Sequence, residues 1–96
     1  MYARVTTFTA KSGKLVEVIR GVRGTMPNVK MQKGMIGGYL LTDKKKGKCL
    51  VVGLWDTEAD LKAGESSAHI NEAMAKFGPL VAGPITQEDY EVSSQA

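Results

Sequence analysis

The hydrophobic and polar positions along the chain change their period several times, and each change marks a predicted element. Residues 2–9 are rich in β-branched and aromatic side chains, which favours a strand. Apolar residues then recur at helical spacing, which predicts an amphipathic helix over about 13–25. The residues that set this spacing are Leu15, Val18, Ile19 and Val22. We expect Pro27 to end or interrupt the helix, because proline disfavours helical backbone at the residue before it.

The middle of the chain predicts two strands joined by a polar turn. The first strand covers 34–43 and contains the pair Gly37-Gly38. A glycine pair is unusual inside a strand and indicates a bulge or the close approach of other groups. The second strand covers 48–56 and is the most apolar stretch of the chain. Because it is short and bounded by turn residues, we expect it to be a central, buried strand.

The last third of the chain predicts a helical region and a final strand. Thr57 has the character of a helix N-cap, with the acidic Asp60 three positions later. Glycine and serine residues at 64–67 divide the helical region, and an apolar stripe at helical spacing then continues to the Gly-Pro pair at 78–79. This stripe consists of Ile70, Ala73, Met74 and Phe77. Residues 85–92 alternate well enough to predict an edge strand.

The resulting order, strand-helix-strand-strand-helix-strand, is the split βαβ pattern of the ferredoxin-like folds. We therefore predict an α+β protein, a single domain over 1–96, with one antiparallel sheet and helices on one face. The predicted strand 48–56 is apolar on both sides and needs a cover for each. Since the helices cover one face, we expect a second copy of the chain to cover the other, as a homodimer through the sheet face.

The composition bounds the class of protein. Of the 96 residues, 43% are hydrophobic and 24% are charged, which is ordinary for a globular domain and excludes wholesale disorder. No apolar run approaches the roughly 20 residues that span a bilayer, and the first residues do not resemble a secretory signal. We therefore expect a cytoplasmic protein without a membrane segment. The net charge is +3, and the lysines of 44–48 account for this excess of positive charge. We expect these lysines to form a solvated turn.

The inventory of reactive residues is small. The single cysteine, Cys49, excludes an intramolecular disulfide and is expected to be a structural core residue. The single histidine, His69, leaves no cluster of metal ligands. The chain contains no P-loop, dinucleotide fingerprint or nucleophile elbow. We therefore expect no metal, flavin or haem cofactor.

Trp55 leaves two interpretations open. Its neighbour on the same strand face is Gly53, and a large ring beside a missing side chain leaves either a packing notch or a cavity. Trp55 is then either a core residue or one wall of a pocket for a flat apolar ligand, with Tyr39 and Phe8 nearby. His69 borders the last apolar stripe, as a surface or capping residue or as a proton acceptor.

Four segments carry a resemblance to a known family. The first is the end of the N-terminal strand, Thr9-Ala-Lys-Ser-Gly13, before the amphipathic helix. The others are Gly34-Met-Ile-Gly-Gly-Tyr-Leu-Leu-Thr-Asp43, Gly53-Leu-Trp-Asp-Thr-Glu-Ala-Asp60 and the closing Tyr90-Glu-Val92. With them the chain resembles, over nearly its whole length, the antibiotic biosynthesis monooxygenase (ABM) family of small dimeric α/β barrel proteins. The resemblance implies a protomer whose sheet packs against its twin's sheet, with a substrate between sheet and helices. Some members oxidise polycyclic aromatic phenols with dioxygen and no metal or flavin, and the substrate anion supplies the electrons.

The resemblance also implies candidate residues. Haem-degrading members carry an asparagine, a tryptophan and a histidine at positions that match Thr6, Gly64 and Met74, so we do not expect haem degradation here. Quinone-forming members use tyrosine, tryptophan and asparagine around the pocket. Tyr39 and His69 are the candidate catalytic residues. The candidate substrate-binding residues are Trp55, Thr6, Phe8, Met74 and Phe77.

The function implied is a cofactor-independent monooxygenase that acts as a homodimer on a small aromatic or quinol molecule. The alternative is a non-catalytic dimeric module for small-molecule binding or stress response, with its pocket filled by its own side chains. RNA-recognition motifs share the topology, but they place stacking aromatic residues on the third strand. That strand here begins Cys-Leu-Val-Val-Gly-Leu, so we expect no binding to nucleic acid.

Overall fold

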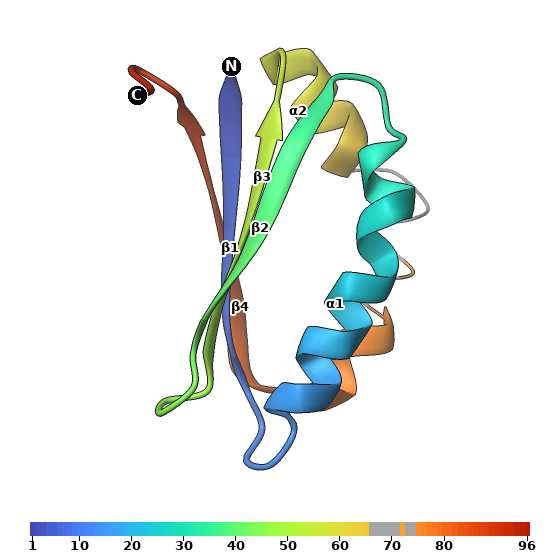
Figure 1. Cartoon of the computed structure of the whole chain (residues 1–96), viewed down its shortest axis with the longest axis vertical. Helices are drawn as coiled ribbons and strands as arrows, with labels where there is room; N and C mark the ends of the chain where they lie inside the picture. Colours follow the sequence, from blue (N-terminus) through green and yellow to red (C-terminus); the bar gives the residue numbers. More distant parts are fainter. Residues whose placement is uncertain (66–71, 73–74) are drawn as a thin grey trace.

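The computed structural model describes residues 1–65, 72 and 75–96, which form a sheet and its covering helices (Figure 1). The elements are β1 (Tyr2–Ala10), α1 (Leu15–Lys30), β2 (Met35–Asp43), β3 (Lys48–Trp55), α2 (Glu58–Glu65), the 3-10 helix η1 (Gly78–Leu80) and β4 (Val81–Glu91). Their order confirms the predicted succession of strands and helices. Of the predicted apolar stripe, only Phe77 lies within the described residues.

The four strands form one antiparallel sheet in the order β2-β3-β1-β4. Strands β3 and β1 are therefore central, and β2 and β4 are the edges. Figure 1 shows α1 and α2 on the same side of the sheet, while the opposite side carries none of the described helices. This confirms the α+β, ferredoxin-like fold with helices on one face, and the central position predicted for the strand at 48–56.

The pairing register decides which side chains face the helices. Phe8 lies opposite Cys49 in the β1–β3 pair, and both are buried, so their face is the helix face. Because side chains alternate along a strand, the residues between them point the other way. We call that other side the open face. Its apolar residues are Val5, Tyr39, Leu41, Leu50, Val52, Leu54 and Tyr90.

The buried residues fall into two groups. The larger group joins the sheet to α1 and to the segment before β4, and it contains Phe8, Ala10, Val18, Val22, Cys49, Phe77 and Val81. Cys49 is fully buried there, and burial raises the pKa of its thiol. Trp55 and Leu61 are also buried but do not belong to this group. Among the described residues, these two therefore lie apart from the main buried group.

Helix α1 is longer than its sequence pattern predicts. It continues through Pro27 to Lys30, so the prediction that Pro27 ends or interrupts the helix is wrong. Proline at this position removes the bond to the carbonyl of Arg23, one turn earlier. Arg23 and Pro27 are both exposed, and water can hydrate that carbonyl. The extra turn places Val29 and Lys30 on the side of α1 that faces the sheet.

Strand β4 also begins earlier than predicted, at Val81 instead of 85. The β1–β4 register shifts between Thr7 and Thr9, where two extra residues of β4 are accommodated. Gly83 has a φ of 78°, a conformation that favours glycine, and Pro84 needs no ladder bond on an edge strand. Because of this irregularity, the first residues of the strand do not show the alternation of apolar and polar side chains from which a strand is predicted.

Two glycines of α1 provide a matched test of this packing. Gly24 is exposed, and a Cβ there would meet nothing within 4 Å, so Gly24→Ala should raise the free energy of unfolding by about 0.5–1 kcal/mol. A Cβ on Gly21 would overlap the Phe77 ring, so Gly21→Ala should lower it by about 1–3 kcal/mol. Urea denaturation measures both. Shifts of the same sign would contradict the packing of α1 on Phe77.

Candidate functional site

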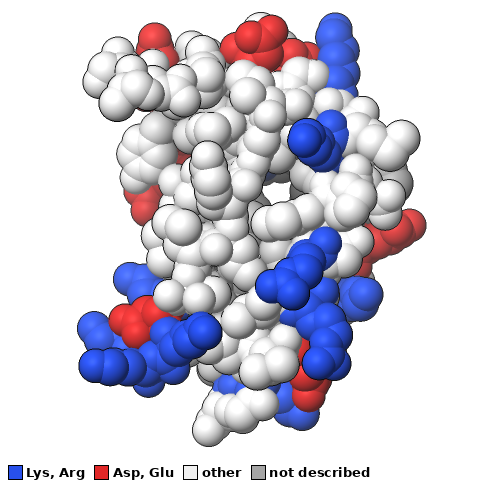
Figure 2. Space-filling view, in the orientation of Figure 1, with Lys and Arg blue, Asp and Glu red and all other residues white. Residues whose placement is uncertain are grey.

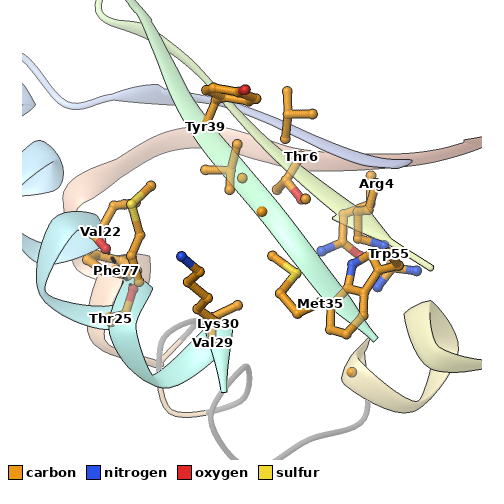
Figure 3. Close-up of a pocket in the computed structure, with 18 of the residues that line it drawn as sticks. Arg4, Thr6, Val22, Thr25, Val29, Lys30, Met35, Tyr39, Trp55 and Phe77 are labelled. Carbon is orange, nitrogen blue, oxygen red and sulfur yellow. Dashed lines mark hydrogen bonds between the residues drawn. The ribbon is translucent and has the colours of Figure 1, made fainter. Parts of the chain in front are cut away.

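A cavity of about 420 Å³ lies between the sheet and α1. Figure 2 shows the molecular surface hollowed near its centre, between the sheet and the helix. Figure 3 shows its walls, with β2 and the sheet on one side and α1 on the other. A space of this size is within the range of about 300–1,000 Å³ that is usual for small-molecule sites. Both Trp55 and several residues of the main buried group line it.

Alternate residues of β1 form part of the sheet wall. Arg4, Thr6 and Phe8 share the helix face and line the cavity in that order. They lie opposite Gly53, Val51 and Cys49 of β3. The wall therefore changes along the strand from a cation through a hydroxyl to an aromatic ring. This change follows from the period of two in β1 and needs no special backbone geometry.

Two glycines face each other where the cavity meets β2 and β3. Gly38 pairs with Gly53, and both line the cavity. A Cβ on Gly53 would lie 3.3 Å from Nε1 of Trp55 and 3.6 Å from Cε of Met35. A Cβ on Gly38 would press on the backbone carbonyl of Val52, at 2.8 Å. The close approach predicted from the glycine pair is confirmed.

A bulge accompanies the glycine pair, as the sequence also indicated. The β2–β3 register shifts between Met35, which pairs with Trp55, and Gly37, which pairs with Leu54. Ile36 is the additional residue, and it is exposed. The bulge lets Met35 share the helix face with Trp55, where both line the cavity.

Trp55 closes one end of the cavity. Its side chain is 5% exposed, and its ring lies against Gly64 of α2, where a Cβ would overlap the ring. Trp55 is thus both buried and a lining residue, so the two interpretations of the sequence meet in one position. The ring also explains why Gly64 carries no side chain, because the indole occupies that space.

Helix α1 supplies the opposite wall from residues spaced three and four apart. They are Val22, Thr25, Met26, Val29 and Lys30. The sequence prediction missed Val29 and Lys30 because it ended the helix near Pro27. The signal was present, since 22, 26, 29 and 30 continue one helical stripe. Met35 was missed for a different reason, because only the bulge in β2 turns it inward.

The described residues that line the cavity include two cations and no anion. Nε and Nη2 of Arg4 each donate a hydrogen bond of 2.8 Å to a carboxylate oxygen of Asp89, and this pairing holds the pKa of Asp89 below its usual range. Lys30 also lines the cavity, and it makes no hydrogen bond or ion pair with the other described residues. None of the described lining residues is acidic. The described walls are apolar with an excess of positive charge.

The candidate residues from the sequence have different positions. Thr6, Phe8, Trp55 and Phe77 all line the cavity. Tyr39 borders it, but the residue is 59% exposed and pairs with Val52 on the open face. Figure 3 shows the Tyr39 ring across the β2 ribbon from Met35 and Trp55. His69 and Met74 lie outside the described residues.

Two other properties concern the described part of the chain alone. Within residues 1–65, 72 and 75–96, no three His, Cys, Asp or Glu side chains are grouped so that they could hold a metal ion. None of the described helices has the length and hydropathy that a membrane span requires.

A ferredoxin-like sheet with helices on one face and an apolar cavity between the layers defines a class of small α+β proteins. The family model described as "Antibiotic biosynthesis monooxygenase" (ABM) matches residues 1–76. The chain therefore belongs to the ABM family, as its sequence resemblance indicated.

Solved structures with similar folds bear related names. A protein of Nitrosomonas europaea named as an antibiotic biosynthesis monooxygenase has a TM-score of 0.86 at 16% identity, covering 98% of this chain and 100% of that one. One of Caulobacter crescentus CB15 with the same name has a TM-score of 0.86 at 22% identity, covering 97% and 90%. SnoaB of Streptomyces nogalater, a cofactor-independent oxygenase, has a TM-score of 0.84 at 14% identity, covering 98% and 94%. At sequence identities this low, the similarity shows that the fold is shared and nothing more.

Two uncharacterized proteins of Mycobacterium tuberculosis are similar in sequence. Each is 28% identical to this chain over 95 residues. The match covers 98% of this chain but 42% of each relative, so the chain spans less than half of their length.

Proposed function

We propose that the protein is a homodimeric, cofactor-independent monooxygenase that acts on a small aromatic molecule or quinol. The single observation that supports this most is the cavity of about 420 Å³ between the sheet and α1. Its walls combine aromatic and aliphatic side chains with few polar groups, which suits a flat aromatic ligand. Membership of the ABM family and the fold shared with an oxygenase of that type point the same way.

The protein's part in such a reaction is to bind, orient and shield the substrate. In an anthrone-type substrate, a ring-activated CH₂ group loses a proton, and the resulting anion reacts with dioxygen. One oxygen atom becomes the new carbonyl and the other leaves as water, with all four electrons taken from the substrate. Thr6 and the indole N–H of Trp55 are the proposed hydrogen-bonding groups, Phe8, Phe77 and Met74 the apolar contacts, and Tyr39 and His69 the candidate catalytic groups.

The open face supports the homodimer. Tyr39, Leu41 and Tyr90 are 59%, 50% and 50% exposed there, and the half-buried Val52 and Leu54 lie among them. A contiguous apolar face of this kind marks an interaction surface. A second sheet placed against it would supply the missing cover. The single-domain extent over 1–96 and the cytoplasmic location remain predictions from the sequence.

A non-catalytic binding module is the second candidate, and one observation favours it. The described lining residues include no histidine and no carboxylate, so a general base for proton removal is absent from that set. Such a module would hold the same class of aromatic molecule without turnover.

Oxygen uptake separates the two functions. Wild-type protein, shown to be folded, is incubated with a panel of anthrone- and hydroquinone-type compounds in an oxygen electrode. The monooxygenase should consume dioxygen with at least one of them, and the rate should survive chelators and rise as the pH passes the pKa of the bound substrate. Binding of the panel without oxygen uptake would favour the module and contradict the monooxygenase.

A further inference from the structure

We propose that Lys30 holds an ionised oxygen of the ligand, so that the cavity selects aromatic molecules that bind as anions. The inference rests on the proposed function in one respect, namely that an aromatic ligand occupies the cavity. It adds a residue that determines specificity and the charge of the ligand.

The position of Lys30 is the first observation. Val22, Met26 and Val29 form a helical stripe that lines the cavity, and Lys30 is the last lining residue of this stripe. The other three residues are apolar, whereas Lys30 is charged. Figure 3 shows its side chain in the space between α1 and the sheet, and the residue is exposed to solvent. Its ammonium group offers three donors, which water satisfies until a ligand in the cavity supplies acceptors.

The balance of charge is the second observation. Arg4 lines the same cavity, but Asp89 offsets its charge through two hydrogen bonds of 2.8 Å. No described lining residue offsets Lys30 in this way. The described walls therefore hold one positive charge more than they balance. This positive charge would repel a cationic ligand, whereas an anionic ligand would neutralise it.

The apolar walls would strengthen this charge once a ligand is bound. Lys30 is exposed, so water screens it in the free protein. An aromatic ligand on the apolar walls would displace part of that water, and opposite charges attract more strongly where water is excluded. A nearby cation lowers the pKa of a phenol by favouring its ionised form. Lys30 would therefore increase the fraction of bound ligand that is ionised. For a monooxygenase of the proposed kind, the ionised form is the one that gives electrons to dioxygen.

The test uses 4-nitro-1-naphthol, whose ionisation changes its colour, and its uncharged methyl ether. Binding and the pKa of the bound naphthol are measured for the wild type, Lys30→Met, Lys30→Arg and the control Lys33→Met. Lys33 is exposed like Lys30 and lies three residues away, but it does not line the cavity. Thermal unfolding confirms that each variant is folded.

We expect Lys30→Met to weaken binding of the naphtholate at least about tenfold, which corresponds to a shift of one unit in the pKa of the bound naphthol. Binding of the ether should change less than about twofold. Lys30→Arg should keep most of the affinity, and Lys33→Met should resemble the wild type. A loss of naphtholate affinity on Lys30→Met supports the proposal, and 1-naphthoate in the same series shows whether a carboxylate is held as well.

Two results would overturn the inference. In one, Lys30→Met binds the naphtholate as well as the wild type does, while the ether still binds to both; the cavity then remains a ligand site and Lys30 has no part in it. In the other, Lys33→Met loses as much affinity as Lys30→Met, which would reveal general surface attraction. Failure of both the ether and the naphtholate to bind the wild type would instead remove the proposed function, and this inference with it.

Discussion

Replacing Val52 by aspartate should separate the homodimer while each protomer keeps its fold. Val52 lies on the open face, between Val5 of β1 and Tyr39 of β2, and it is half-buried in the protomer. A carboxylate there can still reach water in a monomer, but a second sheet would bury it. Burying an unpaired charge costs several kcal/mol, so the dissociation constant should rise at least about a thousandfold.

Sedimentation equilibrium measures this effect directly. Wild-type protein should show about twice the protomer mass of 10.3 kDa at micromolar concentration, and Val52→Asp should show the protomer mass with an unchanged circular dichroism spectrum. Val16→Asp is the matched control, because Val16 is 66% exposed on α1, away from the sheet. It should leave the mass unchanged. A folded wild-type monomer, or a dimer that survives Val52→Asp, would contradict packing through the open face.

Replacing Trp55 by alanine should cause the largest loss of stability among single substitutions at the cavity. Trp55 is buried, and its ring fills the space beside Gly64. Truncation of a buried tryptophan typically costs about 3–5 kcal/mol. For a domain of this size each kcal/mol corresponds to roughly 4–8 °C in Tm. Calorimetry or urea denaturation measures the change.

Trp55→Phe is the control for this loss. Phenylalanine keeps an aromatic ring near Gly64 and Met35, so we expect it to lose less than half as much stability as alanine does. Trp55→Ala should also weaken the binding of aromatic ligands, because one end of the cavity is then open. A loss of less than about 1 kcal/mol in Trp55→Ala would show that the ring is not part of the packed structure.

Stability and binding meet at Trp55 because this residue is both buried and part of the cavity wall. Among the described residues, it lies outside the main buried group, which contains Phe8 and Cys49. The glycine pair Gly38 and Gly53 also lines the cavity. Larger residues at these glycines would fill part of the space. Because glycine has no side chain, Gly38 and Gly53 lower the packing density of the protomer and leave room for a ligand.

The order of elements and the fold class followed from the sequence because they depend on local patterns. The β-branched and aromatic residues of 2–9, the helical spacing in 15–22 and the apolar stretch at 48–56 are properties of neighbouring residues. The unusual glycine pair in β2 and the small Gly53 beside Trp55 also indicated a space near the sheet. The resemblance to the ABM family implied Thr6, Phe8, Trp55 and Phe77 as site residues, and all four line the cavity.

Tertiary structure decided the rest. Helix α1 continues through Pro27 because the carbonyl that loses its bond lies on an exposed side, and exposure depends on how the helix packs. That extra turn brings Lys30 to the cavity, and the bulge at Ile36 brings Met35 to the same face as Trp55. The charge of the cavity depends on the pairing of Arg4 with Asp89, which are 85 residues apart. The local pattern determined which elements form, whereas the packing of distant residues determined which side chains meet in the cavity and with what charge.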